Sequence, residues 1–321
     1  MIYLSHTARS RLLGVWTLCA ALVLSVPSAA ETILVMKCRD LPQYSEAVNG
    51  FIQEWTAHGM GAAIQTRLLA DWSNAVARVP MDTNARPRVI VAVGTDATRW
   101  AITNSTVPVV FCMVANARQS VMADLTPAKE ARVHGVSLSI PAQAQLAILK
   151  TYLPNVKRVG VIYDPRKSSV VVQDLEEAAA RMGLELVREA VTSESSIPEA
   201  AGRIAARIDV LWAPVDSSVF NSRSAQFVLT QMLEHKVPVM GFSENMVKAG
   251  ALLAPVVNYE AVGRQTARLL RDVLRLDGQS PKPIQGPQDF QMMVNGRVLA
   301  LLGATIPPAA IRQARIINNE E

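Results

Sequence analysis

The chain has 321 residues, of which 50% are apolar and 18% charged, and its formal net charge is +5. This length suits about two domains of roughly 150 residues, each able to bury a sizeable core. The basic residues form no run or stripe that would indicate a nucleic-acid partner, and no apolar segment after residue 30 is long enough to span a membrane.

The first 30 residues have the pattern of a secretory signal peptide. Arg9 and Arg11 make a basic start, residues 12–26 are largely apolar, and small residues follow up to Ala30. We expect residues 1–30 to be removed on export, which lowers the formal charge to about +3. Two cysteines then remain, Cys38 and Cys112, and the sequence leaves open whether they pair or are buried thiols.

The first half of the mature chain alternates apolar strand-like runs with helical periodicity. This alternation is typical of an open parallel sheet covered by helices. Residues 114–134 are polar and irregular, and a new strand begins at 136–139. The expected strands are 32–37, 62–69, 88–93 and 107–113, and the expected helices are 44–58, 71–79, 95–103 and 142–153.

One strand, loop and helix unit in the middle of the chain is especially clear. Residues 159–163 form an apolar run that ends at the turn signal Asp164-Pro165. Ser168 or Ser169 then provides an N-cap for the following helix. Because ligands of parallel sheets bind beyond the carboxyl ends of the strands, the loop 164–169 is a candidate binding loop.

The second half repeats the order of the first, which predicts an α/β fold of two Rossmann-like lobes with parallel sheets. The matching segments are 89–96 with 210–217, 107–111 with 237–242, and the strand at Ile33 with the strand at Val159. The tail adds a strand at 251–257, a helix at 259–276 and a strand at 290–294.

The order of these elements predicts that the chain passes between the lobes about three times, and the crossovers form a hinge. We place them near 136–140, 254–258 and 280–288. The expected N-terminal lobe comprises residues 31–137 and 257–282, and the expected C-terminal lobe comprises residues 138–256 and 283–321. A cleft between two such lobes is a favoured place for a small ligand.

Polar residues gather at the predicted strand ends and form the candidate ligand site. Asp96, Asp216 and Ser168 are equally consistent with helix caps. Trp212 and Phe242 offer flat apolar walls, although a tryptophan inside a strand is more typical of a core. The candidate ligand-binding residues are Arg39, Asp40, Tyr44, Thr95, Asp96, Asn116, Tyr163, Arg166, Lys167, Ser168, Asp216, Ser217, Ser243 and Glu244.

The basic pair Arg166-Lys167 stands beside a helix N-terminus, whose free N–H groups favour an anion. From this pair we expect the ligand to carry a carboxylate or another anionic group.

The sequence offers little evidence of a catalytic, cofactor or metal site. The sequence shows no Gly-rich nucleotide fingerprint and no histidine spacing suited to a metal, so we expect no cofactor and no metal. Residues 241–245, GFSEN, resemble a nucleophile elbow, but the final glycine is missing and no histidine follows His235. A two-lobed racemase needs one cysteine in each lobe, whereas Cys38 and Cys112 both belong to the first. A cleft enzyme is therefore the weaker alternative, and we name no catalytic residue.

The series GTDATRWA, VPVVFCMV, GVSLSIP, LPNVKRVGVIYDP, LWAPVDSSVF, VPVMGFSENMVKAGAL, NYEAVGRQTARLL and VNGRVLALLGATIP resembles the ABC-transporter substrate-binding proteins of the tryptophan/tyrosine type. The resemblance implies a type I periplasmic-binding-protein fold. It implies a monomer in the periplasm that captures a small organic solute and delivers it to a membrane permease with a cytoplasmic ATPase. A periplasmic sensor subunit that hands the solute to a membrane signalling protein is the alternative.

The resemblance also maps ligand-contacting loops of the family onto this chain. These loops correspond to Thr95, the loop around Asn116, the turn 163–165 with Ser168, Asp216, and Ser243-Glu244. The chain departs from the family at Asn116-Ala117, where an Asp-Pro pair is frequent, and at Arg166-Lys167, where Ser-Glu is frequent.

Overall fold

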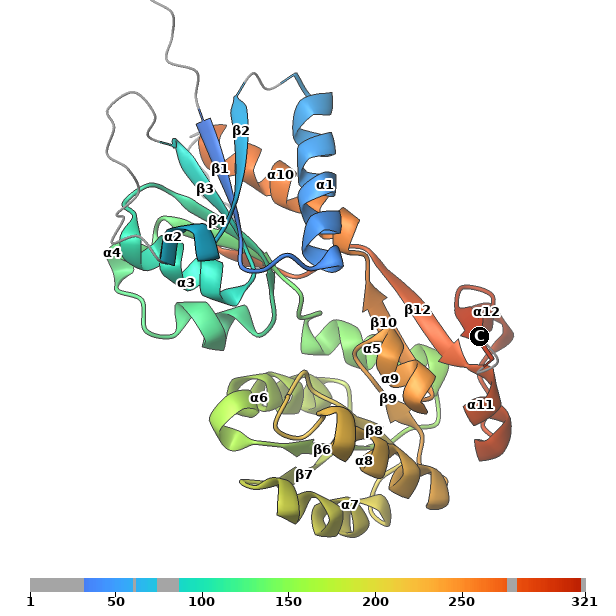
Figure 1. The fold of residues 1–321 in the computed structure, drawn as a ribbon. Coiled ribbons are helices and arrows are strands. Elements are labelled where there is room, and N and C mark those ends of the chain that lie inside the picture. Colours follow the sequence, from blue (N-terminus) through green and yellow to red (C-terminus); the bar gives the residue numbers. More distant parts are fainter. Residues whose placement is uncertain (1–31, 60–61, 74–86, 276–281, 319–321) are drawn as a thin grey trace, which may run out of the picture.

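The computed structural model describes residues 32–59, 62–73, 87–275 and 282–318. These residues form two α/β lobes, one above the other in Figure 1. The expected signal peptide, and the expected helix at 71–79 beyond residue 73, lie outside the described residues. No helix within the described ranges is both long and apolar enough to cross a membrane.

The first lobe is built on a six-stranded sheet of order β11-β5-β4-β3-β1-β2, in which all neighbours run parallel. The strands are β1 (Thr32–Lys37), β2 (Ala63–Leu68), β3 (Val89–Val93), β4 (Val109–Val114), β5 (Val133–Ser137) and β11 (Ile284–Gln285). The helices are α1 (Pro42–Ala57), α2 (Ala70–Ser73), α3 (Thr95–Asn104), the π-helix η1 (Arg118–Met122), α4 (Pro127–Glu130) and α10 (Tyr259–Arg275).

The second lobe is built on a seven-stranded sheet of order β13-β12-β10-β9-β8-β6-β7. The strands are β6 (Arg158–Tyr163), β7 (Glu185–Ala190), β8 (Val210–Trp212), β9 (Val239–Met240), β10 (Leu253–Val257), β12 (Phe290–Asn295) and β13 (Arg315–Ile317). The helices are α5 (Ala142–Tyr152), α6 (Pro165–Arg181), the 3-10 helix η2 (Glu194–Ser196), α7 (Ile197–Ala205), α8 (Ser222–Glu234), α9 (Glu244–Ala249), α11 (Gly296–Leu302) and α12 (Pro308–Ile311).

The two sheets confirm the predicted duplication. The order β5-β4-β3-β1-β2 of the first sheet is repeated as β10-β9-β8-β6-β7 in the second. The strand at Ile33 therefore corresponds to the strand at Val159, as the sequence pattern indicates. The pair β10–β12 is antiparallel, which adds strands from the chain's tail to the second sheet.

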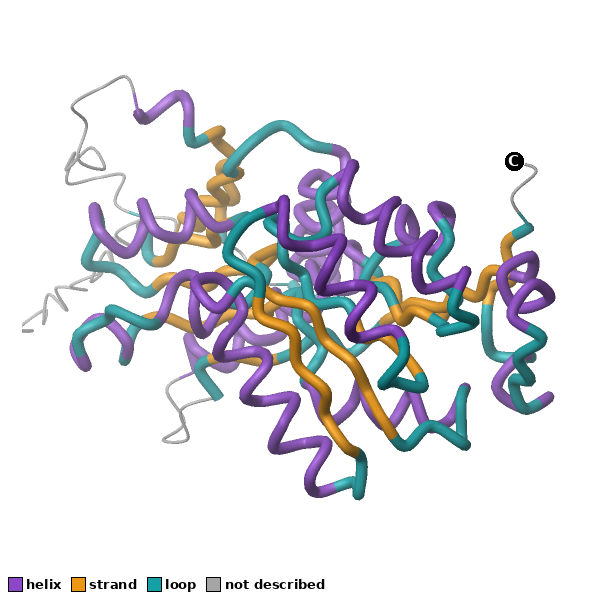
Figure 2. Tube along the Cα trace, turned by 90° about the horizontal axis from the view of Figure 1, so that it is seen from below, coloured by secondary structure: helices purple, strands orange, loops and turns teal. Residues whose placement is uncertain are grey.

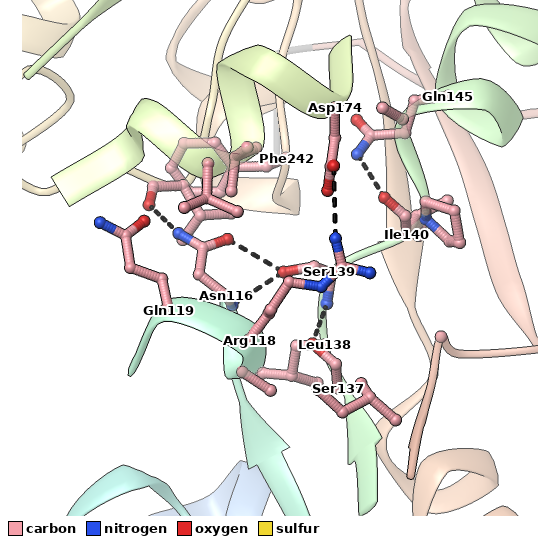
Figure 3. A pocket seen from close by; sticks show the side chains of 18 of the residues that line it. Asn116, Arg118, Gln119, Ser137, Leu138, Ser139, Ile140, Gln145, Asp174 and Phe242 are labelled. Atoms are coloured by element: carbon pink, nitrogen blue, oxygen red, sulfur yellow. Dashed lines mark hydrogen bonds and ion pairs between the residues drawn. The ribbon is translucent and has the colours of Figure 1, made fainter. Parts of the chain in front are cut away.

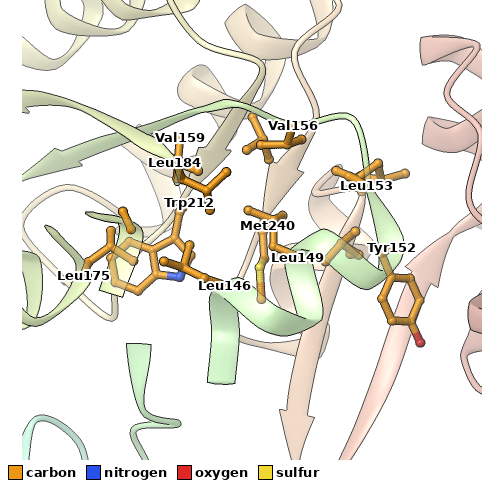
Figure 4. Packing of buried hydrophobic residues seen from close by; sticks show 14 of the residues in the cluster. Leu146, Leu149, Tyr152, Leu153, Val156, Val159, Leu175, Leu184, Trp212 and Met240 are labelled. Atoms are coloured by element: carbon orange, nitrogen blue, oxygen red, sulfur yellow. The ribbon is translucent and has the colours of Figure 1, made fainter. Parts of the chain in front are cut away.

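Helices cover both faces of the central strands of each sheet, and Figure 2 shows the helices around the strands from below. In the first lobe, Phe51 of α1 packs against one face and Ala101 of α3 belongs to the cluster on the other. In the second lobe, Leu146 of α5 and Leu175 of α6 pack with Trp212 of β8 (Figure 4). Burial on both sides explains the continuous apolar runs of these strands.

The helix after β6 begins earlier than the sequence pattern indicates. We expected Ser168 or Ser169 as its N-cap, but α6 begins at Pro165 and Asp164 is the cap. The Asp164 carboxylate accepts a hydrogen bond from the Arg166 N–H at 3.0 Å, and proline suits the first helical position because it has no N–H to satisfy. Ser168 lies buried in the first turn.

Three short crossovers join the lobes, at residues 138–141, at Asn258 and at residues 286–289 (Figure 1). We call these three segments the hinge. The structure places β11 (Ile284–Gln285) in the first sheet, two residues beyond the boundary expected at 282. The strand expected to begin at Val136 begins at Val133.

The chain returns to the first lobe through α10, which packs along α1 (Figure 1). Gly50 and Gly263 lie at this helix contact. A Cβ atom at Gly263 would stand 1.8 Å from the carbonyl oxygen of Ala47, and one at Gly50 would stand 2.0 Å from the carbonyl oxygen of Glu260. Glycine therefore permits the two helix backbones to touch.

Candidate functional site

A cavity of about 240 Å³ lies between the lobes beside the hinge. Residues 116–119 of the first lobe form one wall, and helix α6 with Trp212, Val215 and Phe242 of the second lobe forms another. The hinge residues 138–141 and Gly286, together with the adjoining Val257, complete the lining. Because every wall belongs to a different lobe or crossover, movement of the lobes changes the shape of this cavity.

Amide and hydroxyl groups supply most of the polar lining, and Figure 3 shows their arrangement. The Ser139 hydroxyl accepts a hydrogen bond from the Asn116 backbone N–H at 2.9 Å and donates to the Asn116 side-chain oxygen at 3.1 Å. Gln145 donates to the Ile140 carbonyl at 2.7 Å and accepts from the Trp212 indole N–H at 2.8 Å. The indole is thus held in one orientation at the cavity wall.

Arg118 and Asp174 are the charged residues among the described cavity lining, one from each lobe. Their charged groups lie 3.4 Å apart, and their side chains are 71% and 48% exposed, respectively. The two charges cancel, so the cavity as a whole is neutral. Such a lining suits a neutral or zwitterionic solute better than a net anion.

The residues proposed from the sequence in the first lobe surround the ends of β1, β3 and β4. Of the six, Asn116 lines the cavity. Arg39 and Asp40 lie on an exposed loop, and Lys37 pairs with Asp40 at 2.7 Å. The remaining three, Tyr44, Thr95 and Asp96, lie at the first turns of α1 and α3.

In the second lobe, most of the proposed residues are engaged in local contacts. The Lys167 ammonium and Ser217 hydroxyl lie 3.5 Å apart, the Ser243 hydroxyl caps α9, and Glu244 pairs with Lys248 at 3.0 Å. The other residues proposed there are Tyr163 at the end of β6, Arg166 and Ser168 in the first turn of α6, and Asp216 after β8. None of the eight lies in the described lining of the cavity.

The Arg166 side chain points to Asp164, the N-cap of its own helix α6. Its guanidinium donates to the Asp164 carboxylate at 2.7 and 2.9 Å and to the Thr192 carbonyl at 3.0 Å. The guanidinium bonds to Asp164 hold the pKa of that carboxyl well below its usual range, because they stabilise the charged carboxylate. The charge of Arg166 is therefore compensated within the second lobe, and this geometry does not support the expected contact between Arg166 and an anionic ligand.

The two described cysteines are free thiols. They lie on either side of the end of β3, where the Cys38 N–H donates to Val93 and the Gly94 N–H donates to Cys112. Burial raises the pKa of the Cys112 thiol to about 12. Burial and a hydrogen bond to Asp96 raise the pKa of Cys38 as well.

We expect a thiol reagent at neutral pH to modify Cys38 slowly and to leave Cys112 unmodified in the folded chain, because the thiolate is the reactive form. In denaturant both should react at similar rates. Mass spectrometry of the labelled peptides measures this, and a Cys38→Ser variant provides the control. Equal labelling of Cys112 in folded and denatured protein would contradict the expectation.

Several residues that line the cavity were not predicted from the sequence. No sequence motif indicates a binding role for Arg118, Gln119 or Asp174. Gln145 has the pattern of an ordinary helix residue. The hinge residues did give a signal, since the expected crossover near 136–140 overlaps the segment that lines the cavity. A cavity built at a predicted hinge is thus easier to locate than its individual polar contacts.

Comparison with known proteins places the chain among binding proteins. A family model described as ABC transporter substrate binding protein matches residues 41–316. A tyrosine-binding protein of Clostridioides difficile (strain R20291) is 24% identical over 272 residues, which cover 81% of this chain and 77% of that protein.

Two solved structures share the fold. One is the ligand-free, open structure of a substrate binding protein with adhesive properties from Clostridium difficile, at 22% identity and a TM-score of 0.71, covering 91% of this chain and 100% of that one. The other is an ABC domain from Streptococcus pneumonia in complex with L-Trp, at 21% identity and a TM-score of 0.60. The match covers 90% of this chain and 100% of that one. The two-lobed architecture is that of the type I periplasmic binding proteins.

Proposed function

This chain belongs to the ABC transporter substrate-binding proteins, and on that premise we propose that it captures a small organic solute between its lobes and delivers it to an ABC importer. The family consists of binding proteins and not of enzymes, so the cleft-enzyme alternative is set aside. We further propose that the protein is exported to the periplasm and that a permease with its ATPase is its partner.

The observation that carries this proposal is the cavity at the hinge. Asn116, Gln119 and Phe242 line it from different lobes (Figure 3), and residues of the hinge crossovers complete the lining. A solute that contacts both walls stabilises the closed arrangement relative to the open one, because only the closed arrangement offers both sets of contacts. A permease that recognises the closed form then receives loaded protein selectively.

We propose an aromatic amino acid as the solute. The volume of about 240 Å³ is slightly below the about 300–1,000 Å³ of common ligand pockets, which favours a small molecule. Phe242 offers an aromatic wall and is itself supported edge-to-face by Phe220, with ring centroids 6.4 Å apart. Asp174 places a carboxylate at the cavity and Arg118 a guanidinium, which together match an ammonium and a carboxylate. The relatives that bind tyrosine and L-Trp support the same class.

The test is binding of L-tyrosine, L-tryptophan and L-phenylalanine to the mature chain, measured by thermal shift and calorimetry. A ligand that binds only the folded state raises the melting temperature. We expect Phe242→Ala to weaken binding about tenfold, because a well-placed aromatic contact contributes about 0.5–1.5 kcal/mol beyond its buried area. Phe227→Ala is the matched control, since Phe227 is 40% exposed on α8 and does not line the cavity.

Absence of any melting shift with all three amino acids would contradict the proposed solute class. Equal affinities of the Phe242→Ala and Phe227→Ala variants would contradict the proposed site.

A further inference from the structure

Residues 113–122, which we call the cross-lobe segment, comprise the end of β4, the following turn and the π-helix η1. The segment reaches the second lobe at three points. The Asn116 side-chain amide donates to the Val215 carbonyl at 3.4 Å. Arg118 pairs with Asp174 at 3.4 Å, and the Gln119 side-chain amide donates to the Arg166 carbonyl at 3.5 Å. These contacts make the segment a bridge between the two lobes at the cavity wall.

The backbone of the cross-lobe segment departs from regular geometry at several positions. Met113 and Asn116 have φ angles of +58° and +49°, a left-handed region that non-glycine residues seldom occupy. Residues 118–122 form a π-helix, a conformation found often at functional sites. Strained backbone of this kind persists where surrounding contacts determine it, so the conformation of the segment depends on its partners.

The same segment is tied to the hinge. Ser139, in the first crossover, exchanges two hydrogen bonds with Asn116, and the Leu138 N–H donates to the Val114 carbonyl at 2.9 Å. Asn116 therefore contacts the hinge through one end of its amide and the opposite lobe through the other. Asn116 thus connects Ser139 of the hinge with Val215 of the second lobe.

The cross-lobe contacts are individually weak. Their lengths of 3.4–3.5 Å lie at the outer limit of effective hydrogen bonds, and the Arg118–Asp174 pair is exposed, so salt screens it. The side-chain oxygen of Gln119 is buried with no hydrogen-bond partner in the described part of the chain. The Arg166 carbonyl fixes this orientation, because only the NH₂ end of the amide can donate to it. An unpaired buried acceptor opposes closure.

We propose that the cross-lobe segment is a closure switch that holds the ligand-free protein near the balance point between open and closed lobes. The Arg118–Asp174 pair favours closure and the unpaired Gln119 oxygen opposes it. This inference concerns regulation of the proposed binding cleft and rests on the proposed function. Near balance, a small contribution from a bound solute is sufficient to shift the population.

The test measures lobe separation in ligand-free protein. Spin labels on Thr103→Cys in α3 and Glu177→Cys in α6, in a Cys38→Ser background, report the open and closed populations by double electron–electron resonance. The variants are Asp174→Asn, Arg118→Gln, the charge exchange Arg118→Asp with Asp174→Arg, and Gln119→Met. Each is measured at about 0.1 M and about 1 M salt, where the screening length falls from about 10 Å to about 3 Å.

We expect Asp174→Asn and Arg118→Gln to raise the ratio of open to closed protein about two- to fivefold at low salt, as an exposed ion pair permits, and to have no effect at high salt. The charge exchange should restore the original ratio. Gln119→Met removes both the unpaired oxygen and the amide donor to the Arg166 carbonyl. Because that donated bond is 3.5 Å long and weak, we expect loss of the unpaired acceptor to dominate and to shift the ratio towards the closed form.

Unchanged distance distributions for the ion-pair variants at low salt, or a shift of Gln119→Met towards the open form, would overturn the proposal. Because no solute is present, these outcomes are independent of whether the aromatic amino acids bind. If those amino acids fail to bind and the distances still shift as expected, the closure switch stands and the proposed solute class falls.

Discussion

Replacing Gly263 with alanine is expected to lower the free energy of unfolding by about 2 kcal/mol. At most exposed helix positions, replacing glycine with alanine stabilises the folded protein by about 0.5–1 kcal/mol, because glycine loses more conformational freedom on folding than alanine does. Here the new Cβ would stand 1.8 Å from the Ala47 carbonyl oxygen and 2.8 Å from the Phe51 nitrogen. These are backbone atoms of α1, which cannot rotate aside, so α10 must separate from α1. Overpacking of a well-packed core costs about 1–3 kcal/mol and sometimes more, which exceeds the gain in helix propensity.

The matched control is Gly202→Ala in α7. Gly202 is also helical, but a Cβ there would meet no atom within 4 Å, so we expect a gain of about 0.5–1 kcal/mol. Denaturant unfolding followed by circular dichroism measures both variants. A Gly263→Ala midpoint equal to or above that of the parent chain would show that α1 and α10 do not touch in this way.

Strand positions and the two-lobed duplication were predictable because the physical cause acts locally. All five residues of Val89–Val93 are buried, since helices cover both faces of the sheet, and this produces the unbroken apolar run visible in the sequence. The repeated order of such runs was sufficient to predict two equivalent sheets. The hinge was similarly indicated by the points at which the tail had to return between lobes.

The start of α6 shows how two suitable residues compete for one role. Asp164 and Ser168 are both good N-cap residues, and the pattern alone favoured the serine. Pro165 decides between them, because a proline at the first helical position makes the preceding Asp164 the cap. Ser168 is then free to bond elsewhere, and its hydroxyl donates to Asp216 at 2.9 Å.

The cavity lining was less predictable because it depends on the placement of the two lobes. Arg166 was a reasonable candidate for a ligand contact, yet its guanidinium folds back onto Asp164. Asp174 lies about two turns further along α6 than Arg166 and meets Arg118 only when the lobes approach each other. No local pattern encodes such a contact, so strand ends were identifiable from the sequence and their partners across the cleft were not.

Asp216→Ala is expected to destabilise the second lobe by about 3 kcal/mol or more. Asp216 is 2% exposed, and its carboxylate accepts hydrogen bonds from the Asp164 N–H, the Ser168 hydroxyl and the Ser218 N–H, all at 2.9 Å. Removing the carboxylate leaves the buried Asp164 N–H and Ser168 hydroxyl without this partner, as well as the partly buried Ser218 N–H. Each unsatisfied buried group costs about 1–3 kcal/mol. The carboxylate thereby joins the loop after β8 to the first turn of α6.

Ser217→Ala is the control for this prediction. Ser217 is the exposed neighbour of Asp216, and a surface substitution of this kind changes stability by no more than about 0.5 kcal/mol. Asp216→Asn should fall between the two, because the amide oxygen still accepts hydrogen bonds whereas its NH₂ group does not. Unfolding midpoints in denaturant distinguish a structural role from a ligand contact. If Asp216→Ala unfolds at the midpoint of the parent chain but binds L-tyrosine more weakly, Asp216 belongs to the binding site and its structural assignment is wrong.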